Sequence, residues 1–262
     1  MIMRLSIVVP CYNEEPVLQE TTVRLSAVLD SLVEKRKISS DSFILYINDG
    51  SRDMTWTIIE SLHDRNSYVK GLNLAGNVGH QNALMAGLMT AKGYADVLIS
   101  IDADLQDDVS VIEEMVDRYK EGYDIVYGVR SSRDSDTFFK KNTALAFYKL
   151  MSWLGVKSVY NHADYRLMSR RAVEQLGNYK ERNLFLRGIV PLIGYETTSV
   201  YYRRSERFAG ESKYPLSKMF NFAIDGITSF SVKPLRLIAS LGFLFLLCSL
   251  VAVVYTLYVY FN

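Results

Sequence analysis

The sequence predicts an α/β fold with a mostly parallel, doubly wound sheet and helices on both faces, followed by a C-terminal membrane segment. Short apolar runs alternate with amphipathic helical segments through the first half of the chain, a pattern typical of such sheets. Polar residues follow several of these runs. A long apolar stretch without any charge extends from Ile238 to Phe261.

The composition is that of a globular protein and excludes several classes of function. The chain has 262 residues, of which 49% are hydrophobic and 23% charged, so a disordered protein is excluded. The formal net charge is +1 and no nucleic-acid-binding motif is present, so we expect no nucleic-acid partner. Cys11 and Cys248 are far apart, which disfavours a disulfide framework and favours a reducing compartment.

The apolar runs of the first half are predicted to form buried strands, with amphipathic helices between them. The runs cover residues 5–10, 43–49, 69–74, 97–102 and 124–129. In the first intervening helix, apolar residues share one face at helical spacing: Leu18, Leu25, Val28, Leu29 and Leu32. Beyond about residue 135 the pattern becomes more helical and aromatic, so we expect mainly helices there.

The residues at the ends of these strands are predicted to meet at one rim. Ligands bind doubly wound sheets at the carboxyl ends of the strands. The polar segments at that end cover residues 10–14, 48–51, 102–104 and 128–130. Neither G-x-G-x-x-G nor G-x-x-x-x-G-K-[ST] occurs, so a nucleotide site must bind phosphates by groups other than a glycine-rich loop.

Asp102 and Asp104 are candidate ligands of a metal that binds phosphates, because two carboxylates separated by one residue at a strand end can both face the cleft. Hard divalent cations prefer oxygen ligands and keep positions open for phosphates. Such a cation would stabilise a leaving nucleoside diphosphate as a Lewis acid. The alternative is a solvated strand end. We expect the following carboxylates, Asp107 and Asp108, to cap the next helix.

The stretch from Ile238 to Phe261 is predicted to span a membrane, for which about 20 apolar residues are needed. A buried core helix is the alternative. Tyrosines lie near one end and basic residues precede the other, which predicts a cytoplasmic N-terminal domain. Residues 215–234 mix aromatics with lysines and are predicted to form helices in the membrane interface, or else ordinary core helices. The predicted divisions are 1–214, 215–234 and 235–262.

Several motifs, in this order, resemble the family 2 glycosyltransferases of the GT-A fold: IVVPCYNEE, YINDGSRD, NVGHQNALMAG and SIDADLQDD. A second set, YGVRSSR, DYRLMSRRA and RFAGESKYPLSKM, is similar to the polyprenyl-phosphate hexosyltransferases. That group includes dolichyl-phosphate mannose synthases and bactoprenol glucosyltransferases. The GHQNALMAG form is most similar to the bactoprenol branch. Members of that branch usually have two spanning helices, whereas this sequence shows one, which suggests truncation, a shortened natural form or pairing in a homo-oligomer.

The resemblance implies a role for each candidate residue. The nucleoside would be held by Pro10, Tyr12, Glu14 and Asp49. Mg²⁺ or Mn²⁺ and the diphosphate of the nucleotide-sugar would be bound by Asp102, Asp104 and Gln106. The acceptor phosphate would be bound by Arg130, Arg133 and Ser212, since guanidinium forks suit phosphate oxygens. The catalytic residues would be Asp104, Asp164 and Arg130.

Two of these assignments have alternatives. By resemblance, Asp164 is the candidate catalytic aspartate. Because a phosphate acceptor is already anionic, we expect Asp164 to orient a substrate rather than to act as a base. The alternative role for Asp164 is a structural hydrogen bond. Arg207 and Lys213 lie in a loop that would close over the diphosphate and that also suits a basic anchor on anionic lipid. We expect His80 to hydrogen-bond near the donor or to cap its helix.

The resulting prediction is a metal-dependent, inverting enzyme anchored in the inner membrane, with its catalytic domain in the cytoplasm. It would transfer a hexose, most simply glucose, from a UDP-sugar to undecaprenyl phosphate for a cell-envelope polysaccharide. The alternative transfers mannose from GDP-mannose. A processive synthase is disfavoured, because neither Trp56 nor Trp153 follows an arginine as in Q-x-x-R-W. A membrane-tethered module that only binds nucleotide-sugars is the remaining class.

Overall fold

The computed structural model describes residues 2–131, 162–180, 185–204 and 233–261. The chain divides into two compact units. One comprises Met1–Thr137 and Val159–Lys213, and the other comprises Phe138–Ser158 and Tyr214–Asn262. The predicted interface helices fall almost wholly outside the described residues, and the predicted divisions of the chain stay predictions.

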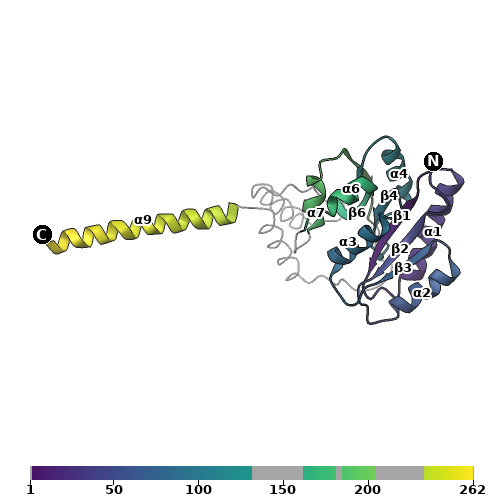
Figure 1. The fold of residues 1–262 in the computed structure, drawn as a ribbon, viewed down its shortest axis with the longest axis horizontal. Coiled ribbons are helices and arrows are strands. Elements are labelled where there is room, and N and C mark those ends of the chain that lie inside the picture. Colours follow the sequence, from purple (N-terminus) through teal and green to yellow (C-terminus); the bar gives the residue numbers. More distant parts are fainter. Residues whose placement is uncertain (1, 132–161, 181–184, 205–232, 262) are drawn as a thin grey trace. The chain divides into compact units, whose positions relative to one another are not determined.

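Within the described residues, the first unit contains one seven-stranded sheet of strand order β3-β2-β1-β4-β6-β5-β7 (Figure 1). The strands are β1 (Leu5–Cys11), β2 (Phe43–Asn48), β3 (Val69–Asn73), β4 (Val97–Ser100), β5 (Ile125–Arg130), β6 (His162–Ser169) and β7 (Thr197–Tyr202). The predicted strands are all present, with small differences at their ends. The mostly parallel α/β fold is therefore confirmed.

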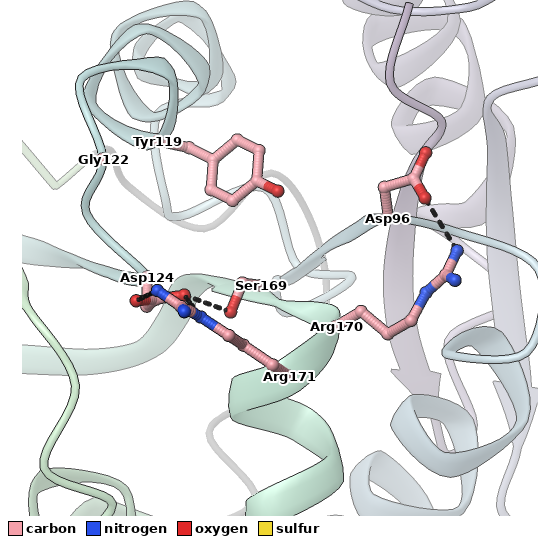
Figure 2. A pocket seen from close by; sticks show the side chains of 7 residues that line it. All are labelled: Asp96, Tyr119, Gly122, Asp124, Ser169, Arg170 and Arg171. Carbon is pink, nitrogen blue, oxygen red and sulfur yellow. Dashed lines mark hydrogen bonds and ion pairs between the residues drawn. The ribbon is translucent and has the colours of Figure 1, made fainter. Parts of the chain in front are cut away.

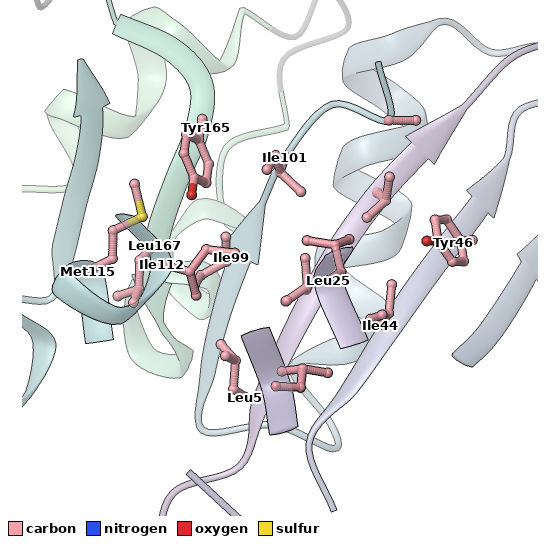
Figure 3. Packing of buried hydrophobic residues seen from close by; sticks show 14 of the residues in the cluster. Leu5, Leu25, Ile44, Tyr46, Ile99, Ile101, Ile112, Met115, Tyr165 and Leu167 are labelled. Carbon is pink, nitrogen blue, oxygen red and sulfur yellow. The ribbon is translucent and has the colours of Figure 1, made fainter. Parts of the chain in front are cut away.

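Helices cover both faces of this sheet, as predicted. On one side lie α1 (Leu18–Glu34), α2 (Thr55–Arg65) and α4 (Ile112–Lys120), and on the other α3 (His80–Ala91) and α6 (Arg170–Leu176). Successive side chains of a strand point to opposite faces, so Val8 meets α3 whereas Ile7 and Val9 belong to the cluster under α1. That cluster is continuous from Tyr46 to Leu167 (Figure 3).

One glycine allows α3 to lie close to the sheet. A Cβ atom on Gly87 would come within 2.6 Å of Ile47 Cδ1 and 2.7 Å of Val8 Cγ1. Non-bonded carbon atoms do not approach each other this closely, so a side chain here would force α3 or the side chains of Ile47 and Val8 to move. The glycine thereby fixes the height of the N-terminus of α3, which carries His80 to the rim of the sheet.

β6 corrects the expectation of helices beyond residue 135. It is inserted between β4 and β5 and runs antiparallel to both, whereas β7 pairs with β5 in parallel. Ser100 at the end of β4 lies opposite Arg166, so the first half of β6 reaches the carboxyl rim of the sheet. The charged residues of its sequence, HADYRLMS, obscured a strand that is buried wherever its side chains are described.

The described part of the second unit is α9 (Lys233–Phe261). Its 24-residue stretch Ile238–Phe261 has a mean hydropathy of 2.5 and is long and apolar enough to cross a membrane. None of this stretch is buried, which favours the membrane-spanning prediction over the alternative of a buried core helix.

Candidate active site

The loops after β1 and β2 are joined by hydrogen bonds that fix the polar residues of both. Asn13, at a left-handed φ of 54°, donates its backbone N–H to Ser51 Oγ (3.0 Å) and accepts the Arg52 N–H on Oδ1 (2.8 Å). Asparagine tolerates this conformation better than most residues. Tyr12 and Glu14, predicted to hold a nucleoside, are thereby half-buried at the rim. Pro10 is buried within β1.

Asp49, the other predicted nucleoside ligand, fastens the loop that leads into α3. Its buried carboxylate accepts the backbone N–H of Val78 on Oδ1 (2.7 Å) and that of Gly79 on Oδ2 (3.0 Å). The next residue must be glycine, because Gly50 has a φ of +64° and a Cβ would lie 2.5 Å from Asn77 N. Asp49 therefore has a structural role, and the nucleoside contact predicted for it stays a prediction.

The segment after β4 turns three polar side chains to one side. Burial alternates strictly from Ile101 to Asp107, so that the predicted metal ligands face outward between buried neighbours: Asp102, Asp104 and Gln106. Thr21 Oγ1 holds this segment by donating to the carbonyl oxygen of Ala103 (2.8 Å). Asp104 Oδ1 accepts the Gln106 N–H (3.1 Å), and Gln106 Oε1 accepts from Arg204 Nη2.

These side chains fit a hard divalent cation, with the rest of its coordination left to phosphate or water. Among the described residues there is no group of three or more His, Cys, Asp or Glu side chains that could hold a metal by itself. The electrostatics nevertheless favour a cation. The pKa of Asp102 is raised to about 6, because burial, followed by the nearby carboxylates with Asp107 first, outweighs the lowering effect of His80.

Asp164 on β6 is the centre of a cationic cluster. Its carboxylate, only 8% exposed, contacts Arg166 Nη2 at 2.5 Å, Arg187 Nη2 at 3.3 Å and Gln81 Nε2 at 3.2 Å. Burial would raise the pKa of Asp164, but Arg187, His80 and Arg166 outweigh it and hold the pKa well below its usual range. A carboxylate that binds protons so weakly is a poor general base and a good anchor for cations.

His80 connects Asp164 to the candidate metal ligands. Its Nε2 lies 3.6 Å from Asp102 Oδ1 and 3.6 Å from Asp164 Oδ2. Burial would lower the pKa of the imidazole, but the bond to Asp164 and the charge of Asp102 raise it to about 9. The N-cap of α3 is Gly79, so His80 does not cap its helix. The alternative, a contact near the donor site, stays a prediction.

The two carboxylates predicted to be helix caps have different roles. Asp108 does cap the following 3₁₀ helix, Val109–Val111, by accepting the Ser110 N–H (2.9 Å). Asp107 does not: it is buried, and its Oδ1 accepts from Arg130 Nη2 (2.8 Å) and from the hydroxyl of Tyr202 (2.6 Å). The prediction for Asp107 was wrong because the alternation that exposes Gln106 turns Asp107 inward. Arg130, predicted to bind the acceptor phosphate, is thus held by a buried carboxylate.

A separate hollow of about 380 Å³ lies at the opposite end of β4 (Figure 2). Its charged side chains pair with one another: Asp96 with Arg170 at 2.7 Å, and Asp124 with Arg171. It lies at the amino end of β4, where doubly wound sheets do not bind their ligands. We therefore place the candidate active site at the carboxyl rim.

The structure adds residues to the site and leaves some predicted ones outside its description. Gln81, Asp107, Arg187 and Tyr202 join the predicted residues. No spacing in the sequence marks Arg187, because it lies in the short helix α7 (Leu186–Ile189) whereas its neighbour Asp164 lies on β6. The predicted ligands outside the described residues are Arg133, Arg207, Ser212 and Lys213.

Comparisons with known proteins agree with this architecture. The family described as "Glycosyl transferase family 2" matches residues 6–177. The "Uncharacterized glycosyltransferase YkoT" of Bacillus subtilis is 58% identical over 248 residues, which is 95% of this chain and 74% of that protein. The "Bactoprenol glucosyl transferase" of Shigella phage SfV is 40% identical over 254 residues, 93% of this chain and 79% of that protein.

Among solved structures, the fold is similar to that of glucosyl-3-phosphoglycerate synthase from Mycobacterium tuberculosis. The TM-score is 0.56 at 16% identity, covering 87% of this chain and 80% of that one. Another crystal structure of that enzyme, in complex with Mn²⁺, UDP and phosphoglyceric acid, has a TM-score of 0.51 at 15% identity and covers 84% of this chain and 75% of that one. At these identities the likeness establishes the fold alone.

Proposed function

Because the chain belongs to glycosyl transferase family 2, we propose that it transfers glucose from UDP-glucose to undecaprenyl phosphate at the cytoplasmic face of the inner membrane. One observation of the site carries this proposal: the alternation after β4 turns Asp102, Asp104 and Gln106 toward the same rim as Asp164. The phage relative named for bactoprenol, similar over 93% of this chain, supports the choice of acceptor.

The donor would lie at the loops after β1, β2 and β4. Tyr12 and Glu14 would hold the nucleoside together with Asp49. Asp102, Asp104 and Gln106 would hold Mg²⁺ or Mn²⁺, and Gln106 Oε1 would exchange its present partner, Arg204, for the cation. When bound, the cation would supply the positive charge that stabilises a diphosphate leaving group.

The proposed reaction is a single displacement with inversion. An oxygen of the acceptor phosphate donates an electron pair to the anomeric carbon, and the bond from that carbon to the diphosphate oxygen breaks. Its electron pair leaves with the nucleoside diphosphate. No proton need be removed, since the phosphate is already ionised at neutral pH. This agrees with the low pKa of Asp164, for which we propose an orienting role.

The apolar helix gives a physical reason for a lipid acceptor. An undecaprenyl chain is confined to the bilayer, so an enzyme that uses it must work at the membrane surface. The stretch Ile238–Phe261 would keep the polar first unit there. Basic residues before this stretch, such as Arg236, support a cytoplasmic orientation.

Transfer of radiolabelled sugar from a panel of UDP- and GDP-sugars to undecaprenyl phosphate in detergent tests the proposal. With Mg²⁺ or Mn²⁺, we expect a lipid-linked product from UDP-glucose, and none with EDTA. If GDP-mannose is the only donor that yields product, the donor is GDP-mannose and the transferred sugar is mannose, as in the mannose synthases. Binding of UDP without product from any donor would contradict the proposed enzyme and favour a binding module.

A further inference from the structure

We propose that Arg187 binds the phosphate group of the acceptor, a role that no pattern in the sequence assigns to it. The inference rests on the proposed function for the identity of the anion. It is carried by the position of the Arg187 guanidinium, which contacts Asp164 at the rim of the sheet and is still 35% exposed.

The structure holds Arg187 in place through Gln81. Arg187 belongs to the short helix α7 (Leu186–Ile189). The Leu186 N–H at the start of this helix donates to Gln81 Oε1 (3.2 Å), while Gln81 Nε2 donates to Asp164 Oδ2 (3.2 Å). One amide therefore fixes both the helix that carries the arginine and the carboxylate that the arginine contacts.

The charges around Asp164 leave a cationic surplus that faces solvent. Arg166 is the closest cation, and with only 1% of its side chain exposed it cannot contact a ligand. The single negative charge of Asp164 is thus already paired. Arg187 makes longer contacts, 3.3 and 3.4 Å, through Nη2 and Nε. Among the described residues its Nη1 has no hydrogen-bond partner, so this nitrogen can donate to a phosphate oxygen.

The order of contacts places Arg187 on the acceptor side rather than the donor side. Asp102 contacts His80, His80 contacts Asp164, and Asp164 contacts Arg187. No ion pair joins Arg187 directly to Asp102 among the described residues. In an inverting displacement the nucleophile enters opposite the leaving group. A cation separated from the candidate diphosphate site by His80 and Asp164 suits the entering phosphate.

Two variants of the full chain in detergent test this inference: Arg187→Gln, which removes the charge, and Arg187→Lys, which keeps the charge and loses the fork. The measurements are the Kd of a short-chain polyprenyl phosphate, the Kd of UDP with Mg²⁺, and the two KM values in the transfer assay. We expect Arg187→Gln to raise the Kd and KM of the polyprenyl phosphate about tenfold or more, with Arg187→Lys intermediate. The UDP values should change less than about twofold. Arg170→Gln, which removes a half-exposed arginine at the opposite end of β4, is the matched control and should leave all values unchanged.

The outcomes separate this inference from the proposed function. The proposed role of Arg187 would be overturned if the acceptor Kd is unchanged in both variants, or if the Kd of UDP rises equally. Transfer by the wild-type chain would still support the proposed function in that case. If the wild-type chain binds the polyprenyl phosphate but transfers nothing, the function fails, and a weaker Kd in the variants still supports Arg187. A wild-type chain that does not bind the lipid phosphate contradicts both. Should Arg187→Gln fail to fold, Arg187→Lys alone tests the role: a higher acceptor Kd supports it, and an unchanged acceptor Kd overturns it.

Discussion

The substitution Asp164→Asn tests whether the cationic cluster is held together by one buried charge. In the variant, the guanidinium of Arg166 loses its counter-charge while remaining buried, with 1% of its side chain exposed. Removing one partner of a buried ion pair costs about 3–5 kcal/mol, because the other charge is left uncompensated. The asparagine oxygen still accepts a hydrogen bond, so we expect a loss near the lower limit, about 3 kcal/mol.

Asp124→Asn provides a matched control for this prediction. Asp124 is also a buried carboxylate paired with an arginine, but the side chain of Arg171 is 63% exposed. Arg171 can therefore return to water, and the asparagine can keep the hydrogen bond from Ser169. We expect a loss of about 1 kcal/mol or less, which leaves a difference of about 2 kcal/mol between the variants.

Chemical denaturation of both variants and the wild-type chain in detergent with EDTA, followed by far-UV circular dichroism, measures this difference. The low pKa of Asp164 means that its stabilisation is fully present above the unfolded pKa, about 3.9, and is lost as the pH falls through the folded value. The gap between wild type and Asp164→Asn should therefore narrow below about pH 4. Equal losses of stability in the two variants at pH 7 would refute the reasoning.

The remaining predictions concern the metal ligands, His80 and the packing of α3. Asp104→Asn should abolish metal-dependent sugar transfer, whereas Asp108→Asn, which keeps a capping oxygen, should retain it; retained transfer by Asp104→Asn would overturn the metal assignment. In EDTA, the His80 imidazole should titrate near pH 9 by NMR, and lower in Asp164→Asn because a partner that raises its pKa is removed. The stabilisation that His80 provides is present below about pH 6.5 and lost as the pH rises through 9. An NMR titration midpoint of His80 near the ordinary value of about 6.5 in both proteins would contradict the contact between His80 and Asp164. Gly87→Ala should destabilise the first unit by about 1–3 kcal/mol, because the new methyl group would overlap Ile47 and Val8; an unchanged denaturation midpoint would show that α3 can move outward freely.

Local pattern was sufficient to predict much of the candidate site. The strands of the first half are short apolar runs, and in parallel strands joined by helices the residues after each run must reach the same rim. Asp102 and Asp104 could therefore be placed together with Tyr12 and Asp49 from the sequence alone. The long stretch from Ile238 to Phe261 likewise carries its own signal, because length and lack of charge are properties of one continuous segment.

Tertiary structure decided which side chains share their charges. Asp107 and Asp108 are adjacent and identical in type, yet one is buried with Arg130 and Tyr202 while the other caps a helix. The alternation after β4 turns Asp107 inward, where its partners come from two other strands, Arg130 from β5 and Tyr202 from β7. Asp164 meets both His80 and Arg187 because β6 enters the sheet in reverse, between strands distant from it in sequence. Periodicity describes how a segment faces its surroundings, but the charges that surround a buried group come from other segments, and only the folded chain brings them within reach.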